Sequence, residues 1–304
     1  MSRYAKVSIA SLAFTFFLAL VISCATAPVT NDSQENSQGN SIRYWKEEGA
    51  ASGRQAMTVS AEELLGQEVP ERKDPKIVIL MYHNLVFGRT GNEYNRDIYN
   101  FEHDLAFLRK RFKIIGFDDL LAIREGSMRL TTDAALVTFD DGDLSMYAIA
   151  YPLLKEYGIE ATFFVISGFV GEIGYMNWSQ IREMAQYRDS SGNRLFTIGS
   201  HGVSHKFLGD VDQSTLIKEL TESRAAIESN TGEPAQYLAL PFGSGAGRKD
   251  IVEIAISAGY KAIRTSDNRF VPASSLDLFR LPGNYIDNSS TDKAMGKIWA
   301  MIGR

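Results

Sequence analysis

Short apolar runs alternate with amphipathic segments along most of this chain, from about residue 76 onward. Runs such as 134–139 are apolar at nearly every position and rich in β-branched residues, which is typical of strands buried on both faces. The segments between them place apolar residues three and four positions apart, as amphipathic helices do. The predicted strands are 77–81, 113–117, 134–139, 161–166, 195–199, 236–240, 260–264 and 279–281. Two helices are predicted to begin at the caps Asn100 and Asp118. Further helices are predicted over 144–157, with a break near Pro152, and over 178–187, 212–232 and 249–258.

Repeated alternation of strand and helix predicts an α/β fold in which parallel strands are wrapped by helices. A distorted or incomplete (β/α) barrel of seven to eight strands fits this pattern better than an open sheet. No Gly-x-Gly-x-x-Gly follows the first strand, which argues against a dinucleotide-binding fold.

The pattern changes before residue 76. Residues 1–23 combine Arg3 and Lys6 with an apolar run from Val7 to Ile22, as a signal peptide does. The run ends at Cys24, where a bacterial lipobox would place its lipidated cysteine; an uncleaved signal anchor is the alternative. Residues 24–75 are predicted to form a flexible tether with a short helix near 61–66. Residues 76–304 are predicted to form the folded domain.

Composition narrows the classes of function. The chain has 304 residues, 44% of them hydrophobic, a net charge of -5 and a pI near 5.5. That charge argues against a nucleic-acid partner, which needs clustered Lys and Arg. Cys24 is the only cysteine, so intramolecular disulfides and cysteine-rich metal sites are excluded. The chain has only four histidines, His83, His103, His201 and His205.

Unusual polar residues follow the predicted strands, where barrel enzymes hold their chemistry. Asp140 and Asp141 follow one strand, and His201 and His205 follow another at a spacing that lets two imidazoles of a helical turn reach one ion. An Asp-rich turn and two capping or solvated histidines are the plain alternatives. Residues 241–245 form a Gly-rich loop that offers either an oxyanion site or a simple turn.

Together these segments resemble the polysaccharide deacetylase (NodB-homology) family over roughly residues 76–287. The resemblance implies hydrolysis of N-acetyl or O-acetyl groups of carbohydrates with one divalent metal, most often zinc, with cobalt, nickel or manganese as alternatives. It implies Asp140 as general base, Asp141, His201 and His205 as metal ligands, and the backbone N–H of Phe242 as an oxyanion donor. The segments that carry it are Thr138-Phe139-Asp140-Asp141-Gly142, His201-Gly202-Val203-Ser204-His205 and Ala239-Leu240-Pro241-Phe242-Gly243.

The chain departs from the family pattern at two places. Many members have a C-terminal Leu-x-His whose histidine is the general acid, but no histidine follows His205 and the corresponding segment is 279–284. Many members also have an arginine in the third motif that orients the base, where this chain has Ala239. His83 follows the first strand and is the best substitute acid; substrate contact or simple packing are equally weighted alternatives.

The sequence also gives predictions for other histidine, arginine and aromatic residues. His103 is expected to be a solvated surface residue beside Glu102 and Asp104. Arg264 and Arg280 lie near strand ends and could pair with the site carboxylates, although a surface salt bridge is favoured. Three aromatic residues after the 161–166 strand are candidates for sugar stacking or for core packing: Phe169, Tyr175 and Trp178.

The leading expectation is an N-deacetylase of the bacterial cell envelope, exported and lipid-anchored at Cys24 on the periplasmic or cell-surface face. Its glycan substrate would contain N-acetylglucosamine, as peptidoglycan and exopolysaccharides do. Two alternatives stay open: a non-catalytic carbohydrate-binding member that kept the fold, and a hydrolase of a small non-carbohydrate amide.

Overall fold

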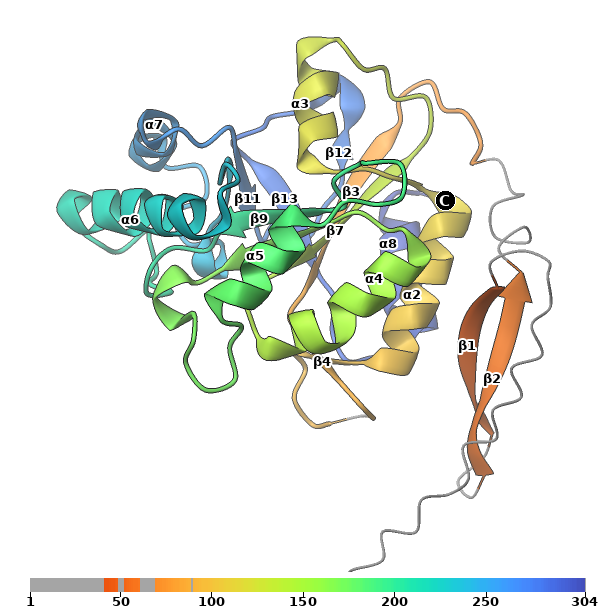
Figure 1. Ribbon diagram of the computed structural model, residues 1–304. Helices are drawn as coiled ribbons and strands as arrows, with labels where there is room; N and C mark the ends of the chain where they lie inside the picture. Colours follow the sequence, from red (N-terminus) through yellow and green to blue (C-terminus); the bar gives the residue numbers. More distant parts are fainter. Residues whose placement is uncertain (1–40, 49–51, 61–68, 89, 304) are drawn as a thin grey trace, which may run out of the picture. The chain divides into compact units, whose positions relative to one another are not determined.

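Seven parallel strands close into a barrel in the computed structural model, which describes residues 41–48, 52–60, 69–88 and 90–303 (Figure 1). The ring closes because the first strand, β3, pairs with both β7 and β13. The (β/α) barrel expected from the sequence is therefore confirmed, with seven strands. In order around the ring they are β3 (Lys76–Tyr82), β7 (Ala134–Phe139), β8 (Ala161–Val165), β9 (Phe196–Ser200), β10 (Tyr237–Ala239), β11 (Ala262–Thr265) and β13 (Leu281–Tyr285).

The barrel is distorted where its strands are short. β10 meets β9 through one pair, Leu238 with Ser200, whereas β3 and β7 stay in register over six pairs. Two further strands extend the sheet outside the ring: β6 (Lys113–Ile114) beside β7, and β12 (Val271–Pro272) antiparallel to β3. The strand predicted over 113–117 is thus real but shorter.

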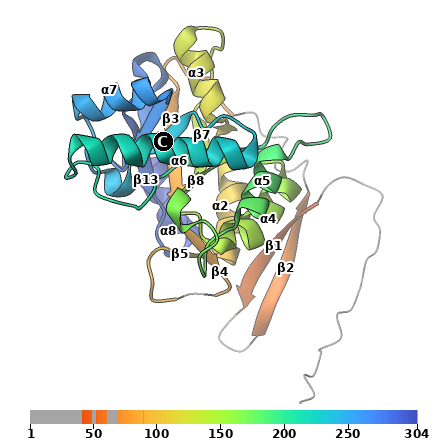
Figure 2. The ribbon, with the colours of Figure 1, turned by 60° about the vertical axis from the view of Figure 1, so that its left-hand side comes forward.

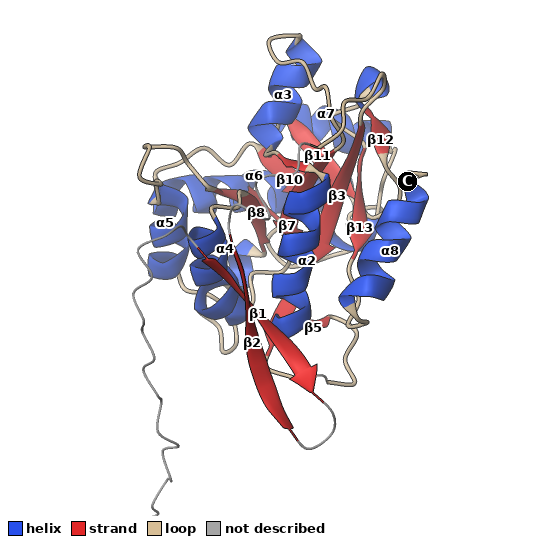
Figure 3. Cartoon of the chain, turned by 90° about the vertical axis from the view of Figure 1, so that its right-hand side faces the viewer, coloured by secondary structure: helices blue, strands red, loops and turns tan. Residues whose placement is uncertain are grey.

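Helices cover the outside of the barrel. Figure 2 shows α6 and α7 side by side on one flank, and Figure 3 shows α2 and α8 outside β3 and β13. The sequence predicted all of these helices except α8. Their bounds are α2 (Ile98–Arg111), α3 (Phe117–Glu125), α4 (Tyr151–Tyr157), α5 (Trp178–Gln186), α6 (Gln213–Thr231), α7 (Lys249–Ala258) and α8 (Thr291–Met301).

Two predicted helix caps are wrong. The cap of α2 is Asp97, because Asn100 lies inside the helix and accepts a hydrogen bond from the backbone of the α8 segment instead. The cap of α3 is Gly116, whose N–H donates to the side chain of Asp119 at 3.1 Å, and Asp118 is already helical. Both errors move a boundary by three residues or fewer, which is the usual uncertainty of helix ends.

The break predicted near Pro152 is present. Residues 146–150 form a π-helical turn, and α4 starts directly after it at Tyr151. Pro152 therefore lies in the first turn of α4, where a missing N–H leaves no bond unmade. The turn is a rare geometry that lets the chain change helical phase here.

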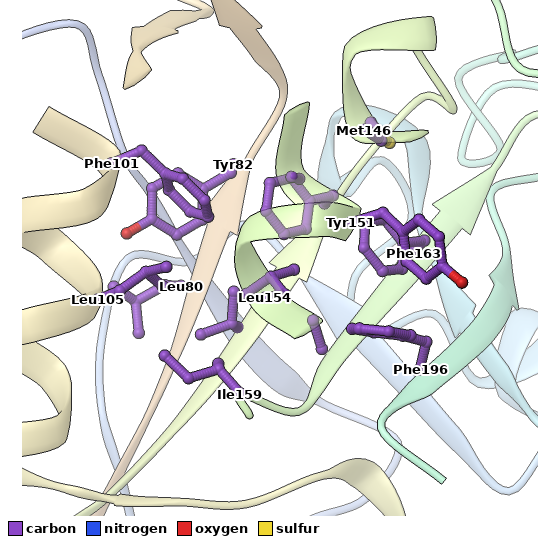
Figure 4. Packing of buried hydrophobic residues seen from close by; sticks show 14 of the residues in the cluster. Leu80, Tyr82, Phe101, Leu105, Met146, Tyr151, Leu154, Ile159, Phe163 and Phe196 are labelled. Atoms are coloured by element: carbon purple, nitrogen blue, oxygen red, sulfur yellow. The ribbon is translucent and has the colours of Figure 1, made fainter. Parts of the chain in front are cut away.

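Alternate residues of the strands pack into two different hydrophobic cores, one outside the barrel wall and one inside it. Leu80 and Tyr82 of β3 face Phe101 and Leu105 of α2 on the outside of the barrel (Figure 4). Ile79, directly before Leu80, packs with the inner residues of other strands and with α3. Each large apolar side chain buried in this way contributes about 1.5–3 kcal/mol. The period of two thus decides which residue at each strand end points into the barrel.

Outside the barrel, the structure has two pairs of strands. β1 (Ser41–Glu48) and β2 (Ser52–Ser60) pair antiparallel, so part of the segment expected as a flexible tether is regular structure. β4 (Asn84–Val86) and β5 (Asn95–Asp97) pair in parallel near the end of β3. The predicted signal peptide, Cys24 and the short helix near 61–66 lie outside the described residues. Within the described ranges, no helix is both long and apolar enough to cross a bilayer.

Candidate active site

The inward positions at the carboxyl ends of the strands share one cavity of about 550 Å³. Asp140 directly follows β7 and His201 directly follows β9, each continuing the inward row of its strand. Because the strands are parallel, their carboxyl ends meet at one mouth of the barrel. The cavity is lined by Met81, His83, Tyr94, Asp140, Asp141, His201, His205, Phe242, Ser266 and Tyr285.

Three of the predicted site residues form a candidate metal centre. Oδ1 of Asp141 lies 3.5 Å from Nε2 of His201 and 3.3 Å from Nε2 of His205, and the three ligand atoms lie within 4.8 Å of one another. That Asp141 oxygen is buried and has no hydrogen-bond partner among the described residues. Two imidazole nitrogens and a carboxylate form a common zinc set that leaves a position open. The residues therefore fit a divalent metal.

His201 is held in the form that a metal ligand needs. Its Nδ1 lies 2.9 Å from the carbonyl oxygen of Ala239, which directs the other ring nitrogen, Nε2, toward the centre. Burial lowers the pKa of His201 to about 3, so the imidazole is neutral at physiological pH. A neutral imidazole can donate its lone pair to a cation.

The two histidines do not share a helical turn, contrary to expectation. Residues 201–208 are irregular, and α6 shapes this loop through a carboxylate that the sequence reasoning missed. Glu219, buried on α6, accepts hydrogen bonds from the backbone N–H of Val203 at 2.7 Å and of Ser204 at 2.9 Å, and from the Ser204 hydroxyl. Its sequence signal is an acid on the apolar face of α6, between Leu216 and Leu220.

Arg264 forms a buried ion pair with Asp140, so the expectation of a surface salt bridge is wrong for this arginine. Nη2 of Arg264 contacts Oδ2 of Asp140, and both side chains are almost completely buried. Burial alone would raise the pKa of Asp140, but Arg264, aided by His201 and His83, outweighs it and holds this pKa below its ordinary value. Oδ1 of Asp140 has no partner among the described residues and remains available as an acceptor.

Arg264 also explains the two departures from the family pattern. It pairs directly with Ala239 of the neighbouring strand, so it lies beside the position where many members have their arginine. On the other side, a Cβ at Gly283 would come 2.6 Å from Cδ of Arg264 and 2.7 Å from the carbonyl oxygen of Thr265. A histidine at position 283 therefore does not fit while Arg264 occupies this space. Arg280, in contrast, is half exposed and pairs with Asp267 at 3.7 Å, as a surface residue does.

The two neighbouring carboxylates have opposite electrostatic surroundings. Burial, followed by repulsion from Asp140, raises the pKa of Asp141 to about 6. Asp140 stays ionised because Arg264 compensates it. Divergent pKa values in a carboxylate pair are typical of sites that assign different roles to the two groups.

Backbone strain is concentrated at this site. Only four non-glycine residues of the described part have a positive φ, and three of them line the cavity: Asp141 at 77°, His205 at 54° and Phe242 at 58°. Such conformations cost on the order of 1–3 kcal/mol each and cluster at functional sites. The surrounding fold therefore holds these three residues in place against a local preference.

His83 lines the cavity, whereas His103 does not. The ring of His83 lies 5.0 Å from that of Tyr94 and 5.7 Å from that of Tyr285, and its Nδ1 has no hydrogen-bond partner in the described residues. Burial lowers the pKa of His83, although Asp140 and Asp141 oppose this effect.

His103 is half-buried on α2, with its ring 4.4 Å from that of Tyr99. Its neighbours Glu102 and Asp104 are buried. The expectation of a solvated residue among surface acids is therefore wrong.

The aromatic candidates after β8 pack outside the cavity lining. Phe169 and Tyr175 contact each other at 5.3 Å, and Trp178 packs against the apolar core under the helices. Instead, the aromatic residues at the cavity are Tyr94, Phe242 and Tyr285.

Known proteins match both the sequence and the fold. A family profile described as polysaccharide deacetylase matches residues 128–263. This segment therefore resembles a polysaccharide deacetylase domain. The Bacillus subtilis protein YxkH is 29% identical to it over 181 residues, 58% of this chain and 60% of that protein. The poly-beta-1,6-N-acetyl-D-glucosamine N-deacetylase of Staphylococcus aureus is 31% identical over 114 residues, 35% of this chain and 39% of that protein.

Solved structures support the same fold for the deacetylase domain. The Streptococcus pyogenes deacetylase PplD superposes with a TM-score of 0.64 at 20% identity, covering 76% of this chain and all of that one. IcaB of Ammonifex degensii superposes with a TM-score of 0.57 at 26% identity, covering 75% of this chain and 97% of that one. The chain spans less than two thirds of the length of its curated sequence relatives, 60% and 39% of the two given above.

Proposed function

We propose that this chain is a metal-dependent hydrolase that removes N-acetyl groups from an N-acetylglucosamine-containing polysaccharide of the cell envelope. The observation that carries the proposal is the convergence of Asp140, Asp141, His201 and His205 in one cavity, with Arg264 compensating Asp140. The named activity of the Staphylococcus aureus relative supports the choice of N-acetylglucosamine.

Each residue has a role that its surroundings support. Asp141, His201 and His205 would hold the metal, which when bound supplies Lewis-acid polarisation and an acidified water. Asp140, ionised and with one free oxygen, takes the proton of the attacking water. The backbone N–H of Phe242, on the rim of the same cavity, stabilises the oxyanion. The leaving nitrogen then needs a proton.

His83 is our candidate for the group that supplies that proton. Of the four histidines, it alone lines the cavity without belonging to the metal centre. Because burial lowers its pKa, the imidazole must gain a proton during the reaction before it can deliver one. Substrate contact through the unpartnered Nδ1 is its other available role.

The proposal is tested by metal analysis and acetate release from N-acetylglucosamine oligomers. The purified chain should bind one zinc, cobalt, nickel or manganese ion and release acetate. Asp140→Asn should keep the metal and lose at least about 100-fold in kcat. No acetate with any of these ions would sink the proposal, and oligomer binding without turnover would favour a non-catalytic glycan-binding protein. Turnover of small amides alone would favour the third alternative.

The role of His83 is tested by varying the leaving group. An aryl acetate ester needs no proton on its departing oxygen, whereas an N-acetyl group needs one on nitrogen. Acid catalysis predicts that His83→Gln loses activity toward N-acetyl substrates and keeps it toward the ester. Equal losses on both substrates would assign His83 to positioning or packing.

We also propose that the chain is exported and anchored by lipid at Cys24. The support is the single cysteine at the end of the apolar run 7–22. Mass spectrometry of the native protein should find a diacylated or triacylated cysteine as the new N-terminus. A native protein that keeps residues 1–23 and carries an unmodified Cys24 would contradict lipid anchoring.

A further inference from the structure

Two stacked phenyl rings form a half-exposed platform at the rim of the catalytic cavity. The rings of Phe207 and Phe242 lie 4.1 Å apart at 13° to each other, and the residues are 51% and 54% exposed. Phe242 lines the cavity, and its ring is 4.4 Å from that of the metal-ligand candidate His205. We propose that this platform binds the sugar residue next to the one that is deacetylated. The inference rests on the proposed function.

The platform is held rigidly relative to the metal ligands. Phe207 follows His205 by two residues, in the loop that Glu219 holds in shape. Leu208, its neighbour, is fully buried and anchors the loop in the core under α6 and α7. Phe242 lies in a short helical turn and is fixed in the left-handed conformation. Neither ring is therefore on a loose loop tip.

The two loops are also tied to each other. The N–H of Gly209 donates to the hydroxyl of Ser244 at 3.0 Å, and a Cβ at Gly209 would come 2.8 Å from the backbone nitrogen of Gly245. This close approach of the two backbones keeps the rings stacked without a ligand. A preorganised surface binds without an ordering cost.

The chemistry of the platform suits a pyranose ring. The stacked rings present the outer face of Phe207 and the edges of both rings, an apolar surface with no hydrogen-bonding group. A sugar presents an apolar C–H face with its hydroxyls at the edge. The platform continues the rim of a cavity proposed to hold one N-acetyl sugar, so the neighbouring residue of the same chain is the occupant of matching chemistry.

The opposite wall of the cavity is aromatic as well. Tyr94 and Tyr285, 5.4 Å apart, belong to the segments that follow β3 and end β13. The ring order places β3 and β13 across the barrel from β9 and β10, which precede Phe207 and Phe242. A glycan can therefore continue past the reacting residue, so the substrate is an oligomer or polymer and a monosaccharide is a poor substrate.

The test compares acetate release from N-acetylglucosamine and from its β-1,4- and β-1,6-linked oligomers of two to five units. The kcat/KM of the intact enzyme should rise at least tenfold from monosaccharide to pentamer. Phe207→Ala should remove most of that gain through KM. It should leave the metal content unchanged.

Matched variants separate stacking from mere apolarity and from misfolding. Phe207→Trp and Phe207→Tyr should keep the gain with chain length, whereas Phe207→Leu should lose it. Ile217→Ala, which removes an exposed apolar side chain on α6, should change nothing. Equal kcat/KM for monosaccharide and pentamer, or an unaffected Phe207→Ala variant, would overturn the inference while the deacetylase function stands.

If the protein turns over none of these substrates, the proposed function fails. The platform is then tested by measuring the binding of the pentamer. Calorimetric titration of the pentamer should then give a Kd that Phe207→Ala weakens at least tenfold. The same Kd in both proteins would overturn the platform independently of catalysis.

Discussion

At the scale of single residues, the central feature is how one arginine serves a buried acid. Asp140 is surrounded by low-dielectric protein, and an unpaired charge there would cost several kcal/mol. Arg264 supplies the compensating charge through Nη2, while its Nη1 donates to Sδ of Met81 at 2.7 Å. The guanidinium thus occupies the inside of the barrel between β3, β7 and β11.

Replacing Arg264 should separate catalysis from metal binding. Arg264→Lys should keep the fold but lose the planar contact, lowering kcat about 10–100-fold with little change in KM. Metal content should stay at one ion, because the ligands are carried by other strands. A variant with reduced metal content and an unchanged kcat per bound metal would contradict this assignment.

A second substitution on the neighbouring strand should restore activity that is lost when Arg264 is replaced. Ala239 pairs directly with Arg264, so the double variant Arg264→Ala with Ala239→Arg returns a guanidinium to the same level of the barrel. Activity in the double variant should exceed that of Arg264→Ala alone. Arg280→Met, which removes a half-exposed surface arginine, serves as the matched control and should be silent.

Gly283 should be intolerant of even one methyl group. Gly283→Ala places a Cβ within 2.6 Å of Cδ of Arg264, so it should destabilise the fold by about 1–3 kcal/mol and lower kcat by displacing Arg264. The two changes share one space, so Gly283→Ala should cost less in an Arg264→Ala background. Gly296→Ala on α8, with open space around it, should cost nothing in urea unfolding.

The site residues that the sequence could predict are those with a local pattern. Asp140, Asp141, His201 and His205 follow strands with clear periodicity, and their placement in one cavity is confirmed. Arg264 lies in a strand of four residues, and nothing in its neighbours distinguishes a buried arginine from an exposed one. Its partner is 124 residues away in the sequence. The burial of Arg264 depends on packing across the barrel. The pattern of neighbouring residues in the sequence carries no information about such contacts.

At the scale of elements, α6 does more than cover the barrel. Its Glu219 satisfies two backbone N–H groups of the loop between His201 and His205, the proposed metal ligands. Groups that orient metal ligands in this way commonly affect metal affinity by 10–100-fold. The helix therefore sets the distance between His201 and His205.

Glu219→Gln should weaken metal binding without removing any ligand. The amide can keep an oxygen for the two N–H groups, which share Oε2, but it loses the carboxylate charge, so these hydrogen bonds weaken and the loop loosens. We expect a 10–100-fold weaker Kd for zinc in a chelator competition titration. Glu222→Gln, on the exposed side of the same helix, should leave the Kd unchanged. Equal affinities in both variants would remove this role from Glu219.

Elements were predictable where their apolar pattern is clear, and α8 and the pair β1 and β2 were missed despite their length. The helices 212–232 and 249–258 are strongly patterned, and Gly232 ends the first of them in the left-handed conformation, as glycine caps do. Strands β4, β5 and β12 have two or three residues, too few for a period of two to show. At the start of α2, Asp97 and Asn100 are both good caps, and only the tertiary contact of Asn100 with α8 decides between them.

At the scale of the whole molecule, the fold encloses acids that resist ionisation. Glu102, buried on α2, accepts a hydrogen bond from the Tyr157 hydroxyl at 2.9 Å, and its other oxygen has no partner among the described residues. Burial raises its pKa to about 7, against the lowering effect of Tyr157. Burial likewise raises the pKa of Glu160 to about 7.

The contribution of Glu102 to stability should therefore fall as the pH rises toward neutrality. Below the unfolded pKa of 4.5 both states hold the proton of Glu102; between 4.5 and about 7 only the folded state does, so unfolding releases a proton and becomes easier with rising pH. Glu102→Gln should raise the free energy of unfolding by about 1 kcal/mol at pH 8 and have little effect at pH 4. Urea unfolding at both pH values measures this, with exposed Glu125→Gln as the control. A pH-independent effect of Glu102→Gln would contradict the linkage.

The clearance at Gly283 also bears on how sequences of this kind can diverge. A side chain gained at position 283 meets Arg264, and a loss of Arg264 leaves Asp140 uncompensated unless another cation is already present. Each single step is therefore harmful, and a side chain at position 283 also meets the carbonyl oxygen of Thr265. Positions 239, 264 and 283 should therefore change together during evolution. A sequence with different residues at these positions could be reached from this one only through variants with impaired activity.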